Sequence, residues 1–167
     1  MGEVFIEGPK ALDAIRYLVT NNVDLQDGQA QYTCMCNYDG GIVDDLIVYR
    51  FNQNKYMLCI NAANRETDFQ WMVNNNPFPK AASIENHSGQ YAQVAVQGRF
   101  AEDTLQKLTS IPLSGISYYH FAVGVFCGIQ DCIFARTGYT GEDGFEVFIP
   151  CSSENQSQTV GVWKKIL

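Results

Sequence analysis

The sequence predicts an α+β protein built from two pseudo-repeated, ferredoxin-like units with mainly antiparallel sheets. The first observation is an internal repeat, in which VFIEGPKALDAIRYL at 4–18 aligns with VAVQGRFAEDTLQKL at 94–108 and Gly8 matches Gly98. The second is that each copy alternates as a strand does and, after its glycine, has the apolar spacing of an amphipathic helix. The third is an apolar fraction of 46%, which is ample for a packed core.

Each unit is predicted to run in the order strand, helix, three strands, helix and strand. In the first unit, the elements after the first helix are strands at 32–37 and 42–50 joined by a tight DGG turn at 39–41, a third strand at 56–64, a helix at about 63–73 and a strand near 81–85. In the second unit, the matching elements are a third strand at 145–153 and a helix that begins near Ser152.

These patterns place the first unit at residues 1–86 and the second at 87–167. The second unit lacks its last strand, and Met1 stands only one residue ahead of the first strand. An unfinished sheet leaves an open edge and an uncovered helix face. We therefore expect the sequence to have been cut from a longer chain at both ends, with the second unit incomplete at its C-terminus.

Charge and composition exclude several kinds of partner. The net charge is -7 with only 11 Lys plus Arg, so the long-range field repels a phosphate backbone and no nucleic-acid partner is expected. No apolar run approaches the length of a bilayer span, and the start of the chain does not read as a secretory signal, so no membrane association is expected. The six cysteines include no CxxC pair, and only His87 and His120 could add nitrogen ligands, which predicts no metal site.

Two aspartates interrupt the strand predicted at 42–50, although aspartate is depleted in strands. Alternation places Asp44 and Asp45 on opposite faces. If the face of Val43 and Ile47 packs in the core, Asp45 lies on that face and needs a partner or a ligand. The alternative is that Asp45 pairs with an arginine or with backbone amides and has no chemical role.

A second stretch, ARTGYTGEDGFEVF at 135–148, is dense in glycine and threonine between two apolar strands. Its glycines allow backbone conformations closed to other residues, which would hold Tyr139 on a constrained loop. Glu146 is the one acid in the strand that follows, and in a cleft it could accept two parallel hydrogen bonds from an aminopyrimidine edge. The alternative is a surface glutamate beside an ordinary glycine-rich loop.

Asparagines and tyrosines supply further candidates. Asn61 and Asn64 flank two alanines where the third strand meets a helix, and one of them is expected to cap that helix while the other is free to bond a ligand. Tyr32 and Tyr118 offer aromatic faces suited to stacking, although tyrosines in strands are more often ordinary packing.

At these residues the sequence resembles a known family. The runs GGIVDDLIVYR, INAAN, ARTGYTGEDGFE and GEVFIEGP, with SYYHF at 117–121, closely resemble the aminomethyltransferases of the glycine cleavage system, the T-proteins. The match covers nearly the whole chain. The KGCYxGQE-type run of the related iron-sulfur maturation and tRNA-linked folate proteins is absent.

This resemblance implies a folate pocket between the pseudo-repeated units and a reaction that moves the aminomethyl group from the lipoyl arm of H-protein to tetrahydrofolate, with release of ammonia. It implies that Asp45 is the catalytic acid beside the reacting pterin nitrogens and that Glu146 holds the pterin ring edge. The remaining folate-binding positions implied by the resemblance are Tyr139, Tyr32, Tyr118, Asn61, Asn64 and Met1. Tetrahydrofolate would be the co-substrate, with no metal, and lipoylated H-protein the partner.

Members of this family are longer at both ends, and arginines that complete their folate site lie beyond Leu167. We therefore expect the longer protein to be active and this piece alone to be weak or inactive. Two alternatives are a folate-binding module of a dimethylglycine or sarcosine dehydrogenase-like oxidoreductase and a non-catalytic folate-binding protein; the presence of both Asp45 and Glu146 in their motifs favours the transferase. The compartment would be the cytoplasm in a bacterium and the mitochondrial matrix in a eukaryote.

Overall fold

The computed structural model describes residues 1–152 and 156–167, and the chain divides into two compact units, Met1–Ser88 and Gly89–Leu167. Each unit consists of one antiparallel sheet with helices packed on it. The predicted α+β class with mainly antiparallel sheets is therefore confirmed.

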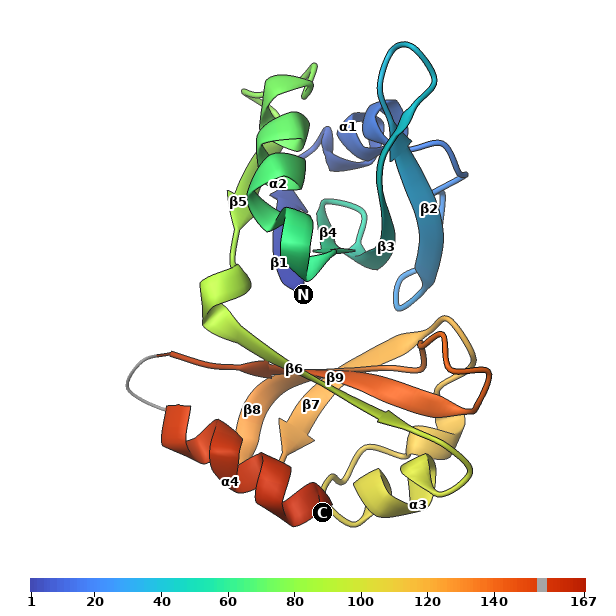
Figure 1. Ribbon diagram of the computed structural model, residues 1–167, viewed down its shortest axis with the longest axis vertical. Coiled ribbons are helices and arrows are strands. Elements are labelled where there is room, and N and C mark those ends of the chain that lie inside the picture. Colours follow the sequence, from blue (N-terminus) through green and yellow to red (C-terminus); the bar gives the residue numbers. More distant parts are fainter. Residues whose placement is uncertain (153–155) are drawn as a thin grey trace. The chain divides into compact units, whose positions relative to one another are not determined.

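The first unit forms a five-stranded sheet in the order β2-β3-β4-β1-β5, in which every neighbouring pair is antiparallel (Figure 1). Its elements are β1 (Gly2–Glu7), α1 (Ala11–Leu18), β2 (Ala30–Cys36), β3 (Ile42–Asn52), β4 (Lys55–Ile60), a 3-10 turn (Ala62–Asn64), α2 (Arg65–Asn74) and β5 (Ser83–Asn86). This order is the predicted one, and the predicted helix at about 63–73 begins as the 3-10 turn and continues as α2.

One face of the first sheet is covered by α1 and α2. Ile15 of α1 and Met72 of α2 are wholly buried in a cluster with Val4, Val48 and Leu58 of the sheet. Burying one such side chain stabilises a fold by about 1.5–3 kcal/mol. This cluster therefore holds the helices against the sheet and fixes which side of β3 faces them.

The other face of β3 carries Asp45. In the antiparallel register Asp45 lies opposite Cys34, and Ile47 lies opposite Tyr32, so these side chains share the face that points away from the helices. Strict alternation along the strand predicts Val43 on the face of Ile47. Instead Val43 packs against the helix-side core, because the register between β2 and β3 shifts at that point.

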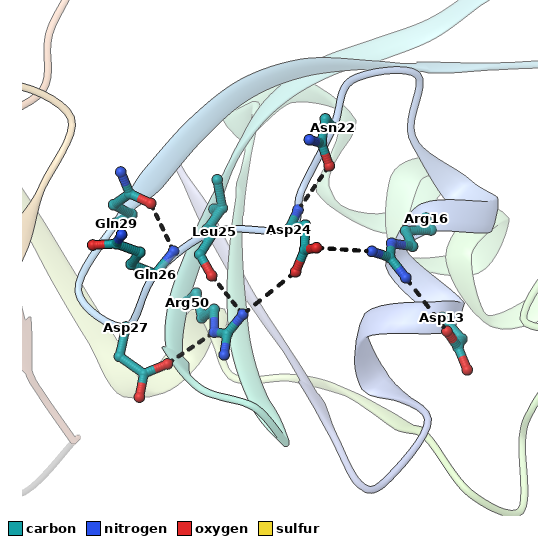
Figure 2. Close-up of polar contacts among 9 residues, drawn as sticks. All are labelled: Asp13, Arg16, Asn22, Asp24, Leu25, Gln26, Asp27, Gln29 and Arg50. Carbon is teal, nitrogen blue, oxygen red and sulfur yellow. Dashed lines mark hydrogen bonds and ion pairs between the residues drawn. The ribbon is translucent and has the colours of Figure 1, made fainter.

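The loop at 20–29 is tied to the end of β3 by Arg50 (Figure 2). The Arg50 guanidinium donates to the Leu25 carbonyl at 2.5 Å and to an Asp27 carboxylate oxygen at 2.8 Å, and a carboxylate oxygen of Asp24 lies 3.9 Å away. Asp24 also pairs with Arg16 of α1 at 3.3 Å. The half-buried Arg50 thus links the loop to the strand, and Arg16 links the same loop to the first helix.

The second unit has a four-stranded antiparallel sheet in the order β6-β9-β8-β7, and Figure 1 shows α3 and α4 along one face of it. Its elements are β6 (Tyr91–Gln97), α3 (Ala101–Gln106), β7 (Phe121–Phe126), β8 (Ile129–Ala135), β9 (Gly144–Pro150) and α4 (Gln156–Ile166), with 3-10 turns at Ser88–Gln90 and Leu113–Gly115. Leu105 of α3 and Val162 of α4 pack against Phe134, Phe145 and Val147 of the sheet. The predicted helix start near Ser152 falls beside residues 153–155, which lie outside the described part of the chain.

The two units repeat the same local geometry after their first strands. Gly8 has φ +126° and Gly98 has φ +113°, values that residues with a side chain rarely adopt. The Gly8 carbonyl accepts from the Ala11 amide at 3.0 Å, and the Gly98 carbonyl accepts from the Ala101 amide at 2.9 Å. In both units the first strand then pairs with the last strand of the following meander. Within the described residues, no helix is long and apolar enough to cross a bilayer.

Candidate functional site

Asp45 is held on β3 by two neutral donors. Its Oδ2 accepts from the Tyr32 hydroxyl at 2.5 Å, and its Oδ1 accepts from the Asn61 side-chain amide at 2.8 Å. No lysine or arginine in the described part of the chain pairs with Asp45. Each carboxylate oxygen can accept a further hydrogen bond. The predicted alternative partners, an arginine or backbone amides, are therefore not what holds this carboxylate.

The two asparagines bind aspartates rather than cap a helix, so the predicted capping role is wrong. Asn61 donates to Asp44 Oδ1 at 2.9 Å and to the Asp45 carbonyl at 3.1 Å in addition to the Asp45 carboxylate, while Asn64 donates to Asp44 Oδ2 at 3.0 Å. Neither side chain makes a capping hydrogen bond. Charged acceptors form the stronger hydrogen bonds, so the amide groups turn toward β3.

Two acids that lie beside Asn61 and Asn64, Asp44 and Asp68, are not among the site residues that the sequence predicts. Asp68 of α2 is wholly buried, and burial, the hydrogen bond with Asp44 and the negative charges of Asp44 and Asp45 raise the pKa of Asp68 to about 7. A usable signal was present, because Asn64 and Asp68 are four residues apart and a helix places such residues on one face. A polar pair on one helix face beside an acidic strand indicates a buried polar contact.

Glu146 of β9 is held in a similar way in the second unit. Its Oε1 accepts from the Gln93 side-chain amide at 2.9 Å, and its Oε2 accepts from the Thr137 hydroxyl at 2.5 Å. Glu146 lies opposite Ala95 and Ala135, on the sheet face turned away from α3 and α4. Both candidate carboxylates thus lie on the helix-free face of their own sheet, and each keeps lone pairs for a ligand.

The loop between β8 and β9 is closed by Arg136. Its guanidinium donates to Asp143 through two nitrogens, at 2.8 and 2.6 Å, and to Glu102 at 2.5 Å. Hydrogen bonding to Asp143 holds the pKa of Arg136 above its ordinary value, although burial opposes this. Tyr139, between the two ends of this closure, is 96% exposed, so its ring is available to a ligand.

The other predicted residues are exposed. Tyr118 forms an edge-on ring contact with Tyr119 at 4.8 Å, and Tyr118, Tyr32 and Met1 are 67%, 45% and 42% exposed. In the first unit the structure brings Tyr32 and Asn61 onto Asp45. In the described part of the second unit, no hydrogen bond or ring contact joins Glu146 to Tyr118 or Tyr139.

A cavity of about 610 Å³ in the second unit contains none of the candidate residues. It lies on the helix side, lined in part by Gln97, Arg99, Thr104 and Glu142. Because the candidate residues do not line this cavity, it gives no support for the predicted folate site. Among the described residues, no three His, Cys, Asp or Glu side chains are grouped so that they could hold a metal ion.

Comparison with known proteins gives consistent matches over the whole chain. The family described as GCVT N-terminal domain matches residues 1–167. An aminomethyltransferase of Caldanaerobacter subterraneus subsp. tengcongensis is 45% identical over all of this chain, and one of Bacteroides fragilis is 49% identical over 89% of it. The chain spans only 43% and 41% of the length of these two relatives.

Solved structures agree with this match. The glycine cleavage system aminomethyltransferase T from Bartonella henselae superposes with a TM-score of 0.83 at 28% identity, covering 99% of this chain and 43% of that one. A heterotetrameric sarcosine oxidase from Corynebacterium sp. U-96 superposes with a TM-score of 0.65 at 10% identity, covering 99% of this chain and 78% of that one. At that identity the second likeness concerns the fold alone.

Proposed function

The chain belongs to the GCVT N-terminal domain family, and from this premise we propose that it forms part of a tetrahydrofolate-dependent aminomethyltransferase of glycine cleavage. Its substrate would be the aminomethyl group on the lipoyl arm of H-protein, and its co-substrate tetrahydrofolate. The aminomethyltransferases among its relatives support the transferase class. The activity belongs to the longer polypeptide, because the chain spans less than half of these relatives.

The proposed reaction balances without any oxidant. The bond between the lipoyl sulfur and the aminomethyl carbon breaks, and so does the bond between that carbon and nitrogen. Two new bonds join the carbon to N5 and N10 of tetrahydrofolate. The two protons released from these nitrogens end on the thiol and on the ammonia, which gives 5,10-methylenetetrahydrofolate, ammonia and a reduced dihydrolipoyl arm.

In this proposal Asp45 faces the reacting pterin nitrogens. A carboxylate there can accept or orient a proton and can stabilise positive charge on the one-carbon centre. The hydrogen bonds from Tyr32 and Asn61 fix both oxygens of Asp45 without neutralising its charge. Two neutral donors therefore suit a group that must stay negative while the iminium-like carbon forms.

Glu146 would hold the pterin ring edge. Its two oxygens, oriented by Gln93 and Thr137, can accept parallel hydrogen bonds from an aminopyrimidine edge. The remaining proposed folate neighbours are Tyr139, Tyr32, Tyr118, Asn61, Asn64 and Met1. Exposed rings among them suit stacking on the flat pterin or on the aminobenzoyl group.

The observation that carries this proposal is a pair of acids in otherwise apolar strands, each held only by neutral side chains on a helix-free sheet face. A structural acid on a strand would be expected to pair with a cation or to lie in solvent. These two acids instead keep lone pairs that can accept hydrogen bonds, as an N–H-rich substrate requires.

The experiment is a turnover assay on a polypeptide of the relatives' full length that contains this chain. Aminomethyl-lipoyl H-protein and tetrahydrofolate are supplied, and ammonia and methylenetetrahydrofolate are measured. Asp45→Asn should lower kcat by about 10²- to 10⁴-fold, the usual contribution of a positioned proton acceptor, with little change in tetrahydrofolate affinity. Asp39→Asn, in the exposed turn that leads into the same strand, is the control. Equal turnover in both variants would refute the role of Asp45.

A further inference from the structure

Asp68 is a buried acid without a donor. Its side chain is 0% exposed, and neither of its carboxylate oxygens accepts a hydrogen bond from an N–H or O–H group of the described residues. An ionised carboxylate in that setting has lost its hydration and has no hydrogen-bond donor to replace it. Such a group is stable in a folded protein only if it is protonated or paired.

The carboxyl group of Asp44 is the side chain that acts on the buried Asp68 carboxyl group, and the two carboxyl groups perturb each other's pKa. Two ionised carboxylates contain only acceptors, so a hydrogen bond between them requires a proton on one of them. Asp44 already accepts from Asn61 and Asn64 and, at 2.9 Å, from the backbone amide of Asp45. Because Asp44 is surrounded by donors and Asp68 has none, the proton belongs on Asp68.

The charges around the pair agree with this assignment. Asp44 and Asp45 of β3 are the charged groups that act on Asp68, and both disfavour its ionised form. No lysine or arginine pairs with Asp68 in the described chain. Burial alone would raise the pKa of Asp44, but the hydrogen bonds donated to it hold that pKa below the ordinary 3.8.

We propose that Asp68 is a positioning residue, whose protonated carboxyl group donates a hydrogen bond to Asp44 and so fixes the asparagine amide that holds Asp45. The path is continuous. Asp68 of α2 orients Asp44, both Asp44 and Asp45 accept from the Asn61 amide, and Tyr32 closes the far side of Asp45. The consequence for catalysis rests on the proposed function of Asp45, whereas the proton on Asp68 does not.

Carbon-13 NMR of aspartate-labelled chain tests the proton directly. One carboxyl carbon should titrate near pH 7 and vanish from the titration in Asp68→Asn. The Asn61 side-chain amide should keep its hydrogen-bonded chemical shifts in Asp68→Asn, whose NH₂ group replaces the donor, and should lose them in Asp68→Leu. Leucine has the same branching at Cγ without a donor but is larger, so circular dichroism must first show that Asp68→Leu is folded. Glu66→Leu, on an exposed position of the same helix, is the control.

Turnover of the full-length polypeptide tests the positioning role. Asp68→Leu should lower kcat about 10- to 100-fold with KM for tetrahydrofolate nearly unchanged, and Asp68→Asn should restore kcat to within about threefold of the wild type. Equal kcat in Asp68→Leu and wild type would overturn the positioning role, and so would the absence of a carboxyl group that titrates near pH 7. A wild-type protein that titrates as expected but transfers no aminomethyl group would refute the proposed function and leave the shared proton established.

Discussion

Replacing Asp68 by Asn should change how the stability of the fold depends on pH. The pKa of this carboxyl group rises from an ordinary 3.8 to about 7 in the folded chain, chiefly through burial. The folded state therefore binds this proton more tightly than the unfolded state does. The resulting stabilisation is fully present below pH 3.8 and is lost as the pH rises through about 7.

The size of this effect follows from the two pKa values. Each pH unit between the folded and unfolded pKa is worth about 1.4 kcal/mol, so Asp68 should cost the fold up to about 4 kcal/mol between pH 4 and pH 8. Glu3 acts in the same direction, because burial raises its pKa to about 7 despite the opposing charges of the N-terminus and Arg65. The wild-type chain should thus lose stability over this range at two sites.

The assay is urea unfolding of the wild type and Asp68→Asn at pH 4.5 and pH 8. Other groups titrate in both proteins, so the difference between their free energies of unfolding isolates Asp68. That difference should shift in favour of the variant by several kcal/mol at the higher pH, because asparagine is neutral throughout. Glu3→Gln should show the same trend independently. A difference for Asp68→Asn that is constant within about 1 kcal/mol across the two pH values would refute the shared-proton argument.

Five further substitutions test how each unit is held together, by urea unfolding. Arg50→Met should lower the free energy of unfolding of the first unit by about 2 kcal/mol, and Arg136→Met should lower that of the second unit by about 3 kcal/mol. Each substitution leaves carboxylates and carbonyls without a donor. Arg16→Met, at an exposed position, should lower the free energy of unfolding by less than about 1 kcal/mol. Gly98→Ala should cost about 1–2 kcal/mol from its φ of +113° alone, since its Cβ meets nothing within 4 Å. Gly8→Ala should cost more, because its Cβ would lie 2.4 Å from a backbone oxygen of the loop before β5, and equal costs at the two glycines would contradict this.

The element order was accessible from the sequence because the repeat appears twice in the same alternating pattern. Gly8 and Gly98 both have a positive φ, and they occupy the same position of the sequence repeat, so the repeat alone is enough to locate this feature in both units. The face of Val43 was not accessible, because a one-residue register shift reverses the side to which a strand residue points and leaves no trace in the apolar pattern.

Only part of the candidate site could be predicted from the sequence, for a similar reason. Asp45 and Glu146 stood out as acids in apolar strands, and the structure finds each with two neutral donors. Asn61 and Asn64 have the composition of helix caps, but their amides are drawn to the carboxylates of β3. The four-residue spacing of Asn64 and Asp68 is a local signal for Asp68, but it does not predict the burial of this acid, which depends on where α2 packs rather than on its neighbours in the chain.

The central claim is that the protein binds tetrahydrofolate and that Glu146 takes part in this binding. The most direct test is a calorimetric titration of tetrahydrofolate into a polypeptide of the relatives' full length that contains this chain and into its Glu146→Ala and Glu142→Ala variants, with circular dichroism to show that all three are folded. The account predicts that the wild type binds, that Glu146→Ala abolishes binding, and that Glu142→Ala, which removes an exposed acid from the neighbouring loop, leaves the affinity unchanged. Equal affinity in all three proteins, or no binding by a folded wild-type polypeptide, would contradict it.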